Sequence, residues 1–200
     1  MPSIEIEDFV LHKSYLDRTA QEAMVADVRA VVAVAPLVAP VTPWGKPMRV
    51  RMTAAGRFGW VADGRGYRYQ EHHPAGGVWP PIPDSVLAVW TAVAACARAP
   101  ECCLVNFYGT GARMGLHQDK DEADFSCPVV SISLGDPALF RIGGTQRSDP
   151  TRSVKLESGD VLVMGGPARR KFHGIDRIQF GGSTLLDHGG RLNLTLRVVT

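Results

Sequence analysis

His117 and Asp119 lie two residues apart in the segment GLHQDKDEADF (115–125), and both have side chains that ligate metals. In an extended chain, side chains at positions i and i+2 project from the same face, so this imidazole and this carboxylate would converge on one point. His173, in the short run FHGI, is the best candidate for a third ligand. Two histidines and one carboxylate on one face of an iron ion leave positions open for a co-substrate and oxygen. The same residues also fit a polar turn and a hydrogen-bonded core histidine, so both interpretations stay open.

The C-terminal run RLNLTLRVV alternates strictly between polar and apolar residues. One face carries Leu192, Leu194, Leu196 and Val198, and the other carries Arg191, Asn193, Thr195 and Arg197. A strand of this kind normally turns its polar face to water, but two arginines and an asparagine could equally line an internal anion pocket. Guanidinium suits a carboxylate because it offers a planar, permanently charged fork. Asn106 and Tyr108, again two residues apart, could add an amide and a phenol to that pocket.

The segment between Lys46 and Tyr69 is basic, although the formal net charge of the chain is only +2. Its basic residues are Lys46, Arg49, Arg51, Arg57, Arg65 and Arg68, with Asp63 as the one acid and Phe58, Trp60, Tyr67 and Tyr69 interleaved. Guanidinium groups and aromatic rings together suit a phosphate backbone with unstacked bases. A twisted hairpin with a solvated basic face is the alternative, and composition does not decide between them.

The elements that must position these residues fall into two groups. The pattern Thr19-Ala-Gln-Glu22 predicts a capping box at the start of a helix that Pro36 stops, and a second helix is expected from Asp84 to Ala99. From Cys102 onward, short runs bounded by Gly, Pro, Asp or Ser predict strands. These runs are CLVNFY, PVVSISLG, ALFRIGG, SVKLE, DVLVMGG, KFHGI and LNLTLRVV. Two helices followed by many strands predict an α+β protein with a β-sandwich or jelly-roll core.

A chain of 200 residues can bury a sizeable core without disulfides. The four cysteines, Cys96, Cys102, Cys103 and Cys127, form no CxxC pair, which favours reduced thiols in the cytoplasm over a zinc knuckle. The N-terminus MPSIEIEDF lacks the basic and apolar regions of a signal peptide. The apolar stretch 30–41 is broken by two prolines and is too short to span a bilayer. We therefore expect a cytoplasmic protein without a membrane segment. Because the sequence shows no obvious interface pattern, we also expect a monomer.

Taken in order, NFY, HQDKDE, FHGI and RLNLTLR resemble the AlkB family of Fe(II)- and 2-oxoglutarate-dependent dioxygenases, close to its bacterial nucleic-acid repair members. The runs VTPWGKPMRVRMTAAGRFGW, GYRY, WPPIPDS, PVVSISLGDPALFRIGG and SGDVLVMGG are similar to that subfamily too. The resemblance covers about residue 40 to the C-terminus, and Met164 stands where an aromatic residue is expected. It implies one dioxygenase domain over 1–200: a double-stranded β-helix (jelly roll) at about 102–200, two packing helices, and a nucleotide-recognition lid at about 45–75.

By this resemblance, His117, Asp119 and His173 would be the ligands of Fe(II). Arg191 would bind the distal carboxylate of 2-oxoglutarate with Asn106, Tyr108 and Asn193, and Arg197 would lie beside its keto-acid end. The implied reaction also takes molecular oxygen. It converts 2-oxoglutarate to succinate, hydroxylates a methyl group on nitrogen, and releases formaldehyde and the restored base.

The implied substrate is N1-methyladenine or N3-methylcytosine in single-stranded or locally opened DNA, or in RNA. Such bases are cationic and cannot pair normally, so they leave the stack at little cost and suit an aromatic ring and a carboxylate. The resemblance places Trp60 on one face of the flipped base and His117 on the other, with Asp121 at the exocyclic amine. Met52, Tyr67 and Arg147 would lie nearby. Glu122 and Asp124 are interpreted as solvated surface acids.

Other activities remain to be weighed. An RNA, tRNA or protein demethylase of the same superfamily would keep the chemistry and change the substrate, and no short motif separates DNA from RNA. A non-catalytic nucleic-acid-binding module would explain the basic segment but not three metal ligands and two arginines. A zinc deaminase needs HxE and PCxxC motifs, which the sequence lacks. Direct-reversal repair of DNA by oxidative demethylation is the function that the resemblance to the AlkB family implies.

Overall fold

The structure is a computed structural model that describes residues 3–42 and 44–200. Seven strands form the larger sheet, in the spatial order β1-β2-β11-β8-β13-β6-β3. Their bounds are β1 Ser3–Ile6, β2 Phe9–His12, β3 Arg51–Gly56, β6 Cys102–Tyr108, β8 Val129–Gly135, β11 Val161–Met164 and β13 Arg191–Arg197. Four strands form a second sheet in the order β10-β9-β12-β7, and every strand pair in the two sheets is antiparallel. Their bounds are β7 Met114–His117, β9 Ala138–Ile142, β10 Arg152–Leu156 and β12 His173–Ile178.

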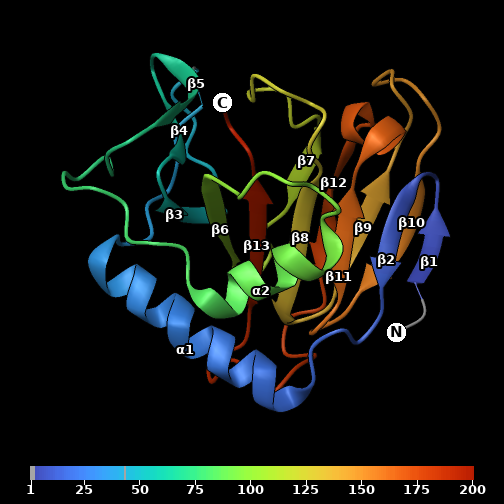
Figure 1. The fold of residues 1–200 in the computed structure, drawn as a ribbon, viewed down its shortest axis with the longest axis horizontal. Coiled ribbons are helices and arrows are strands. Elements are labelled where there is room, and N and C mark those ends of the chain that lie inside the picture. Colours follow the sequence, from blue (N-terminus) through green and yellow to red (C-terminus); the bar gives the residue numbers. More distant parts are fainter. Residues whose placement is uncertain (1–2, 43) are drawn as a thin grey trace.

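The two sheets pack face to face as a jelly roll, which confirms the predicted fold class (Figure 1). Between them lies one hydrophobic cluster that includes Phe9, Phe140, Ile142 and Leu162. Met164, where the resemblance leads one to expect an aromatic ring, belongs to this cluster and is buried. Strands β1, β2 and β3 extend the larger sheet with residues that precede the range 102–200.

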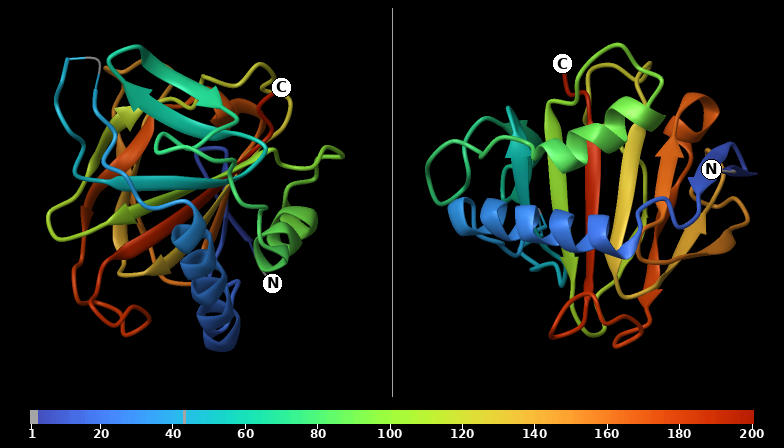
Figure 2. Two further views of the ribbon diagram at one scale, coloured as in Figure 1. Left: turned by 90° about the vertical axis from the view of Figure 1, so that its left-hand side faces the viewer. Right: turned by 60° about the horizontal axis from the view of Figure 1, so that its bottom comes forward.

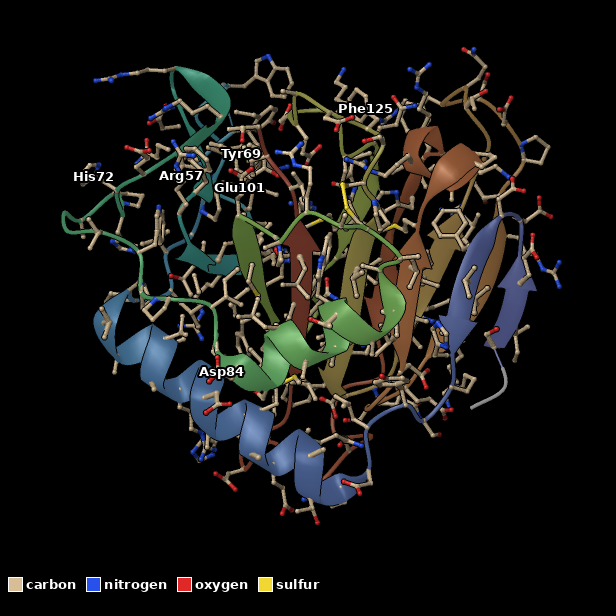
Figure 3. All side chains as sticks on the ribbon, viewed as in Figure 1. Arg57, Tyr69, His72, Asp84, Glu101 and Phe125 are labelled. Atoms are coloured by element: carbon tan, nitrogen blue, oxygen red, sulfur yellow. A yellow bond between two sulfur atoms is a disulfide. The ribbon has the colours of Figure 1, made fainter. Side chains whose placement is uncertain are left out.

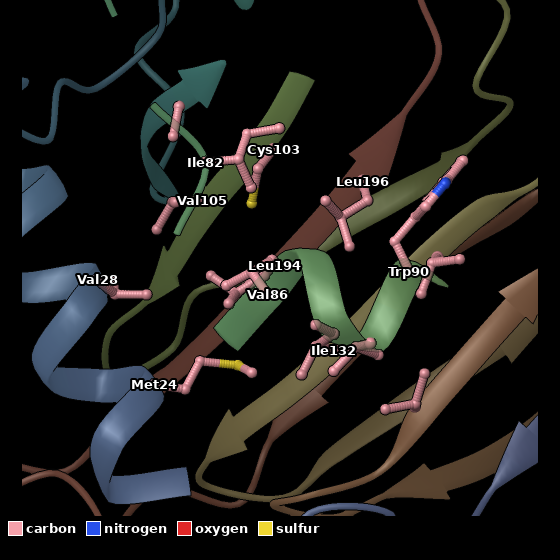
Figure 4. Packing of buried hydrophobic residues seen from close by; sticks show 14 of the residues in the cluster. Met24, Val28, Ile82, Val86, Trp90, Cys103, Val105, Ile132, Leu194 and Leu196 are labelled. Atoms are coloured by element: carbon pink, nitrogen blue, oxygen red, sulfur yellow. The ribbon is translucent and has the colours of Figure 1, made fainter. Parts of the chain in front are cut away.

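Two helices, α1 (Arg18–Val34) and α2 (Asp84–Val93), cover the outer face of the larger sheet (Figures 1 and 2). The apolar residues of β13, Leu194 and Leu196, face the helices and pack with Met24 of α1 and Trp90 of α2 (Figure 4). Because the period of a strand is two, the polar residues of β13 must then face the space between the sheets. The helices therefore fix which face of β13 enters the interior.

The helix ends differ from the sequence-based expectation. The side chain of Asp17, not Thr19, accepts the capping hydrogen bond, from the amide of Ala20, so α1 begins one residue before Thr19. Helix α2 ends at Val93 instead of Ala99. The chain adopts a positive φ of 47° at Ala95, and residues beyond it fold back so that the Arg98 carbonyl accepts from the indole of Trp90. This local turn overrides the helical pattern that continues in the sequence.

A disulfide joins Cys96 and Cys127, so the expectation that all four cysteines are reduced is wrong for this pair. Cys102 and Cys103 are free and buried in strand β6. Burial raises the pKa of the Cys102 thiol to about 12, which keeps it protonated. The spacing of 31 residues between the bonded cysteines is not a local motif, so the sequence alone did not reveal the pair.

A separate hairpin of β4 (Gly59–Asp63) and β5 (Gly66–Gln70) stands at one end of the two sheets (Figures 1 and 2). It contains Trp60, Arg65, Tyr67, Arg68 and Tyr69 of the basic, aromatic segment, and Tyr69 lies at the same end of the sheets as Phe125 (Figure 3). The short 3-10 helix η1 (Gly166–Arg170) connects β11 to β12 and also contributes to this end. The hairpin and the loop after β7 therefore both line one opening between the sheets.

Candidate metal centre and binding cavity

Strand pairing brings the two candidate histidines together. His117 is the last residue of β7 and His173 is the first of β12, and the two are direct partners in the antiparallel ladder. Their ring centroids lie 4.6 Å apart. Asp119, in the loop just after β7, places its carboxylate 3.7 Å from Nε2 of each histidine. One ligand atom from each residue falls within 4.8 Å of the others, as a shared metal ion requires.

Backbone carbonyls set the orientation of both imidazoles. Nδ1 of His117 lies 2.9 Å from the carbonyl oxygen of Gly115, and Nδ1 of His173 lies 3.2 Å from that of Lys171. A carbonyl only accepts, so each Nδ1 carries the proton and each Nε2 keeps its lone pair. This is the arrangement in which an outer partner fixes the tautomer of a metal-binding histidine.

The charge of Asp119 is held by its surroundings. Burial alone would raise the pKa of this carboxyl, but Arg197, His173 and His117 outweigh burial and keep it well below its usual range. Nη2 of Arg197 donates to Oδ2 of Asp119 at 2.8 Å. Burial, followed by the neighbouring His117, lowers the pKa of His173 to about 4. At neutral pH the site therefore offers the Asp119 carboxylate and a neutral His173 imidazole, the protonation states that metal ligation needs.

A cavity of about 490 Å³ extends inward from this centre. The register of β13 with β6 places Arg191 opposite Tyr108 and Asn193 opposite Asn106, while Met52 of β3 lies opposite Asn106 on its other side. Partners in a ladder point to the same face, so these side chains line one wall of the cavity. The polar face of the C-terminal strand is thus turned inward, and the alternative of a solvated polar face is wrong.

Arg191 is the innermost charge of this wall, and its side chain is fully buried. Its Nη2 donates to Ser133 at 2.8 Å, whereas its Nε and Nη1 have no hydrogen-bond partner among the described residues. Burial lowers the pKa of Arg191 to about 10. Burial also raises the pKa of the Tyr108 phenol, which stays a neutral hydrogen-bond donor. Two guanidinium nitrogens that lack a hydrogen-bond acceptor and lie beside a phenol suit a carboxylate, so the residues present fit 2-oxoglutarate.

The hairpin closes over the mouth of the cavity. The indole N–H of Trp60 on β4 donates to Oδ2 of Asp121 at 2.8 Å, and Tyr67 on β5 stacks on Trp60 with centroids 5.4 Å apart. Arg147 also reaches this rim, where its Nη1 donates to the carbonyl of Leu116. The structure therefore brings Trp60, Tyr67, Asp121, Arg147 and buried Met52 to one cavity together with the metal candidates.

Glu122 was expected to be a solvated acid, and this expectation is wrong. Its side chain is 1% exposed and its carboxylate contacts Arg169, Arg197 and the hydroxyl of Tyr69. Asp124 does lie near the surface, where it accepts from Ser126 and pairs with Arg98. Arg169 is also buried, although the basic triplet to which it belongs, Arg169-Arg170-Lys171, is of a kind usually found at the surface. No local pattern marks either residue, because their partners come from distant elements.

Comparisons with known proteins agree with this geometry. The 2OG-Fe(II) oxygenase superfamily profile matches residues 8–197. The alpha-ketoglutarate-dependent dioxygenase AlkB homolog of Caulobacter vibrioides (strain NA1000 / CB15N) is 53% identical over 98% of this chain and 90% of that protein. The structure of OsALKBH1 matches with a TM-score of 0.81 at 33% identity, covering 98% of this chain and 99% of that one. The DNA N(6)-methyladenine demethylase ALKBH1C of Arabidopsis thaliana is 46% identical over 49% of this chain and 24% of that protein.

Proposed function

Because the chain belongs to the AlkB family within the 2OG-Fe(II) oxygenase superfamily, and thus uses Fe(II), 2-oxoglutarate and O2, we propose that it demethylates N-alkylated bases in nucleic acid. The bases we propose are N1-methyladenine and N3-methylcytosine in DNA, which would make the reaction a direct reversal of alkylation damage. One observation carries this proposal. A single cavity holds the metal candidates, an uncompensated arginine, and an aromatic ring paired with a carboxylate at its mouth.

The residues of the cavity would have different roles in the reaction. His117, Asp119 and His173 would hold Fe(II) through Nε2, Oδ1 and Nε2. Arg191 would bind the distal carboxylate of 2-oxoglutarate with Tyr108, Asn106 and Asn193, and Arg197 would lie beside the keto-acid end. When bound, the iron supplies the oxidising chemistry that turns 2-oxoglutarate into succinate and CO2 and inserts one oxygen atom into an N-methyl group. The resulting N-hydroxymethyl base releases formaldehyde by losing the proton of its hydroxyl, and the base regains its normal form.

The mouth of the cavity suits a flipped, cationic base. Trp60 offers an aromatic face, and Asp121 offers a carboxylate that is already oriented by the Trp60 indole. A positive ring is attracted both to an aromatic face and to a nearby carboxylate. The pair would thus bind a methylated adenine or cytosine more tightly than the neutral, unmethylated base. Met52, Tyr67 and Arg147 would complete the walls around it.

The basic segment supports a nucleic-acid partner, but fewer of its charges are available for binding than the sequence suggested. Arg68 pairs with Asp63 at 2.8 Å and Arg57 pairs with Glu71 at 3.3 Å, so these two charges are largely engaged. Four basic residues of the segment form no ion pair with a described carboxylate: Lys46, Arg49, Arg51 and Arg65. Phosphate contacts from such residues position a strand without reading its sequence. We propose that they hold the backbone on either side of the flipped base.

Turnover on defined oligonucleotides tests the proposal. The protein with Fe(II), 2-oxoglutarate and O2 should release formaldehyde from N1-methyladenine placed in single-stranded DNA, duplex DNA or RNA, and the three rates rank the strand forms. An N6-methyladenine oligonucleotide and a methyl-lysine peptide serve as comparison substrates. Formaldehyde from the peptide alone would favour the protein demethylase. Absence of formaldehyde from every N1-methyladenine and N3-methylcytosine strand, with succinate still formed by slow uncoupled turnover, would refute the substrate class while leaving the dioxygenase chemistry in place.

We also propose that the protein works as a monomer in the cytoplasm. Within the described residues no helix is both long and apolar enough to cross a membrane. The Cys96–Cys127 disulfide would have to persist among cytosolic reductants, which is unusual for such bonds. Light scattering behind a sizing column tests the oligomeric state. Cell fractionation with thiol labelling of the extracted protein tests the compartment and the oxidation state together.

A further inference from the structure

Two buried charges outside the metal and co-substrate set contact residues of that set directly. Arg169 on η1 and Glu122 in the loop after β7 have side chains only 3% and 1% exposed, and they pair at 3.2 Å. Removing an ion pair from water is expensive, and a well-packed apolar pair of similar volume is often equally stable. Stability alone therefore does not explain two fully buried charges. Their contacts offer another explanation.

Arg169 binds the loop that contains Asp119 at three points. Its Nη1 donates to the carbonyl of Asp119 at 2.8 Å, its Nε to the carbonyl of Cys127 at 3.2 Å, and its Nη2 to Glu122. The guanidinium also lies 5.1 Å from the ring of Phe125. Segment 119–127 is thus held at several points by the Arg169 side chain. Because η1 leads within four residues to His173, the same side chain ties both halves of the candidate metal centre together.

Glu122 has three partners from three other parts of the chain. Its Oε1 accepts from the hydroxyl of Tyr69 on β5 at 2.6 Å and lies 3.3 Å from Nε of Arg197, while its Oε2 accepts from Arg169. Arg197 in turn donates to Asp119 through Nη2. The four buried charges, Arg169, Glu122, Arg197 and Asp119, therefore form a closed, electrically balanced network. Each carboxylate in it has an arginine partner.

We propose that Glu122 and Arg169 are positioning residues that fix Asp119 and Arg197 relative to His117 and His173. The inference rests on the proposed metal and co-substrate roles. Arg169 sets the path of the loop through the Asp119 carbonyl, and Glu122 sets the plane of the Arg197 guanidinium that holds Oδ2. With Oδ2 held in this way, Oδ1 is the oxygen presented to the metal. Without the pair, Asp119 could rotate and Arg197 could pair with it in other geometries.

The double variant Glu122→Leu/Arg169→Met tests this proposal because it removes both charges and leaves the Asp119–Arg197 pair balanced. We expect a melting temperature within a few degrees of wild type and an affinity of the metal-free protein for Co(II) that is about 10- to 100-fold weaker, as for other outer partners of metal ligands. The d–d absorption of bound Co(II) should also change, since it reports ligand geometry. The KM for 2-oxoglutarate should rise together with a fall in kcat.

The matched control is Arg141→Met/Asp176→Asn, which removes an exposed ion pair of 3.7 Å between β9 and β12. It should leave Co(II) affinity, the Co(II) spectrum and turnover unchanged. The inference would be overturned by a double variant at Glu122 and Arg169 whose Co(II) spectrum is unchanged and whose Co(II) affinity and turnover stay within twofold of wild type. If that variant does not fold, Glu122→Gln decides in its place: we expect weaker Co(II) binding and an altered spectrum, and unchanged values overturn the inference.

His173→Ala separates failure of the inference from failure of the proposed site. Co(II) binding that is insensitive to His173→Ala would refute the metal site itself. Loss of binding in His173→Ala with retention in the double variant would refute only the roles of Glu122 and Arg169.

Discussion

Replacing Arg191 with methionine should stabilise the ligand-free protein, although Arg191 is among the largest fully buried side chains. The guanidinium has one hydrogen bond, to Ser133, and two N–H groups without a described partner. Its pKa falls from 12.5 to about 10 on burial, which corresponds to about 3 kcal/mol at ~1.4 kcal/mol per pKa unit. Below pH 10 the arginine is charged in both the folded and the unfolded protein. A folded pKa below the unfolded one therefore means that the buried charge destabilises the fold.

The net effect follows from the terms that the substitution changes. Methionine occupies much of the volume of the arginine stem, removes the buried charge and loses the hydrogen bond to Ser133, which is worth about 1 kcal/mol. We therefore expect a gain of about 2 kcal/mol in the free energy of unfolding. For a chain of this size that corresponds to a rise of roughly 4–8 °C in Tm.

Denaturation with and without the co-substrate checks this expectation, with Mn(II) present in every sample so that no turnover occurs. Saturating 2-oxoglutarate should stabilise wild type by about 2.7 kcal/mol at a concentration of 100 times Kd, and Arg191→Met by nothing measurable. Arg141→Met, which removes a guanidinium that is 40% exposed, should stay within about 0.5 kcal/mol of wild type. The reasoning fails if ligand-free Arg191→Met is less stable than wild type at an unchanged m-value. It also fails if 2-oxoglutarate stabilises the variant as much as wild type.

Three further outcomes are expected. His173→Ala should abolish both turnover and Co(II) binding, because one of three ligands is lost; residual turnover above 1% would remove His173 from the ligand set. Asp121→Ala should leave Co(II) affinity unchanged and raise the KM for methylated oligonucleotide by about 10-fold, since a charged hydrogen bond is lost; loss of the metal instead would mean that Asp121 and Asp119 have exchanged roles. The hydrogen bond from Lys13, which has the largest effect, and the one from Lys155 lower the pKa of Glu157 from 4.5 to about 2. The stability that this carboxylate contributes should therefore be complete above pH 4.5 and decline as pH falls toward 2. Lys13→Met should flatten this decline in urea midpoints measured against pH, and an identical slope would contradict it.

The inner wall of the cavity could be predicted from the sequence because its signal is local. Strict alternation in RLNLTLR fixes which residues share a face, and the apolar face of Leu194 and Leu196 requires covering elements. The amphipathic helices α1 and α2 supply that cover, which leaves the polar face of β13 to the interior. A strand that is polar on one face normally exposes it, so periodicity alone could not choose between pocket and solvent. The choice depended on the second sheet, which packs over this face and is built from other strands, β7, β9, β10 and β12.

Glu122 shows where reasoning from the sequence stops. Asp121, Glu122 and Asp124 stand almost side by side and have the same chemistry, yet one is at the cavity mouth, one is buried and one lies near the surface. The burial of Glu122 is set by Tyr69, Arg169 and Arg197, which lie 53, 47 and 75 residues away in sequence. The same holds for the Cys96–Cys127 pair. In each case the deciding contact comes from a segment that the local pattern does not contain.

The charges around the cavity suggest why a dianion and a cationic base are the fitting ligands. Among the described residues, Asp119 and Glu122 are matched by Arg197 and Arg169, and His173 is neutral at pH 7 because its pKa is about 4. Arg191 is then the buried charge left without a carboxylate partner. A divalent metal held by the histidines and Asp119 and a dicarboxylate held by Arg191 would cancel each other's charge, and the dicarboxylate would accept the hydrogen bonds that Arg191 lacks. Once they are bound, the inner site keeps one excess positive charge, from Arg191. A second cation would then be favoured beside Asp121, which supports the proposed position of the methylated base at the mouth.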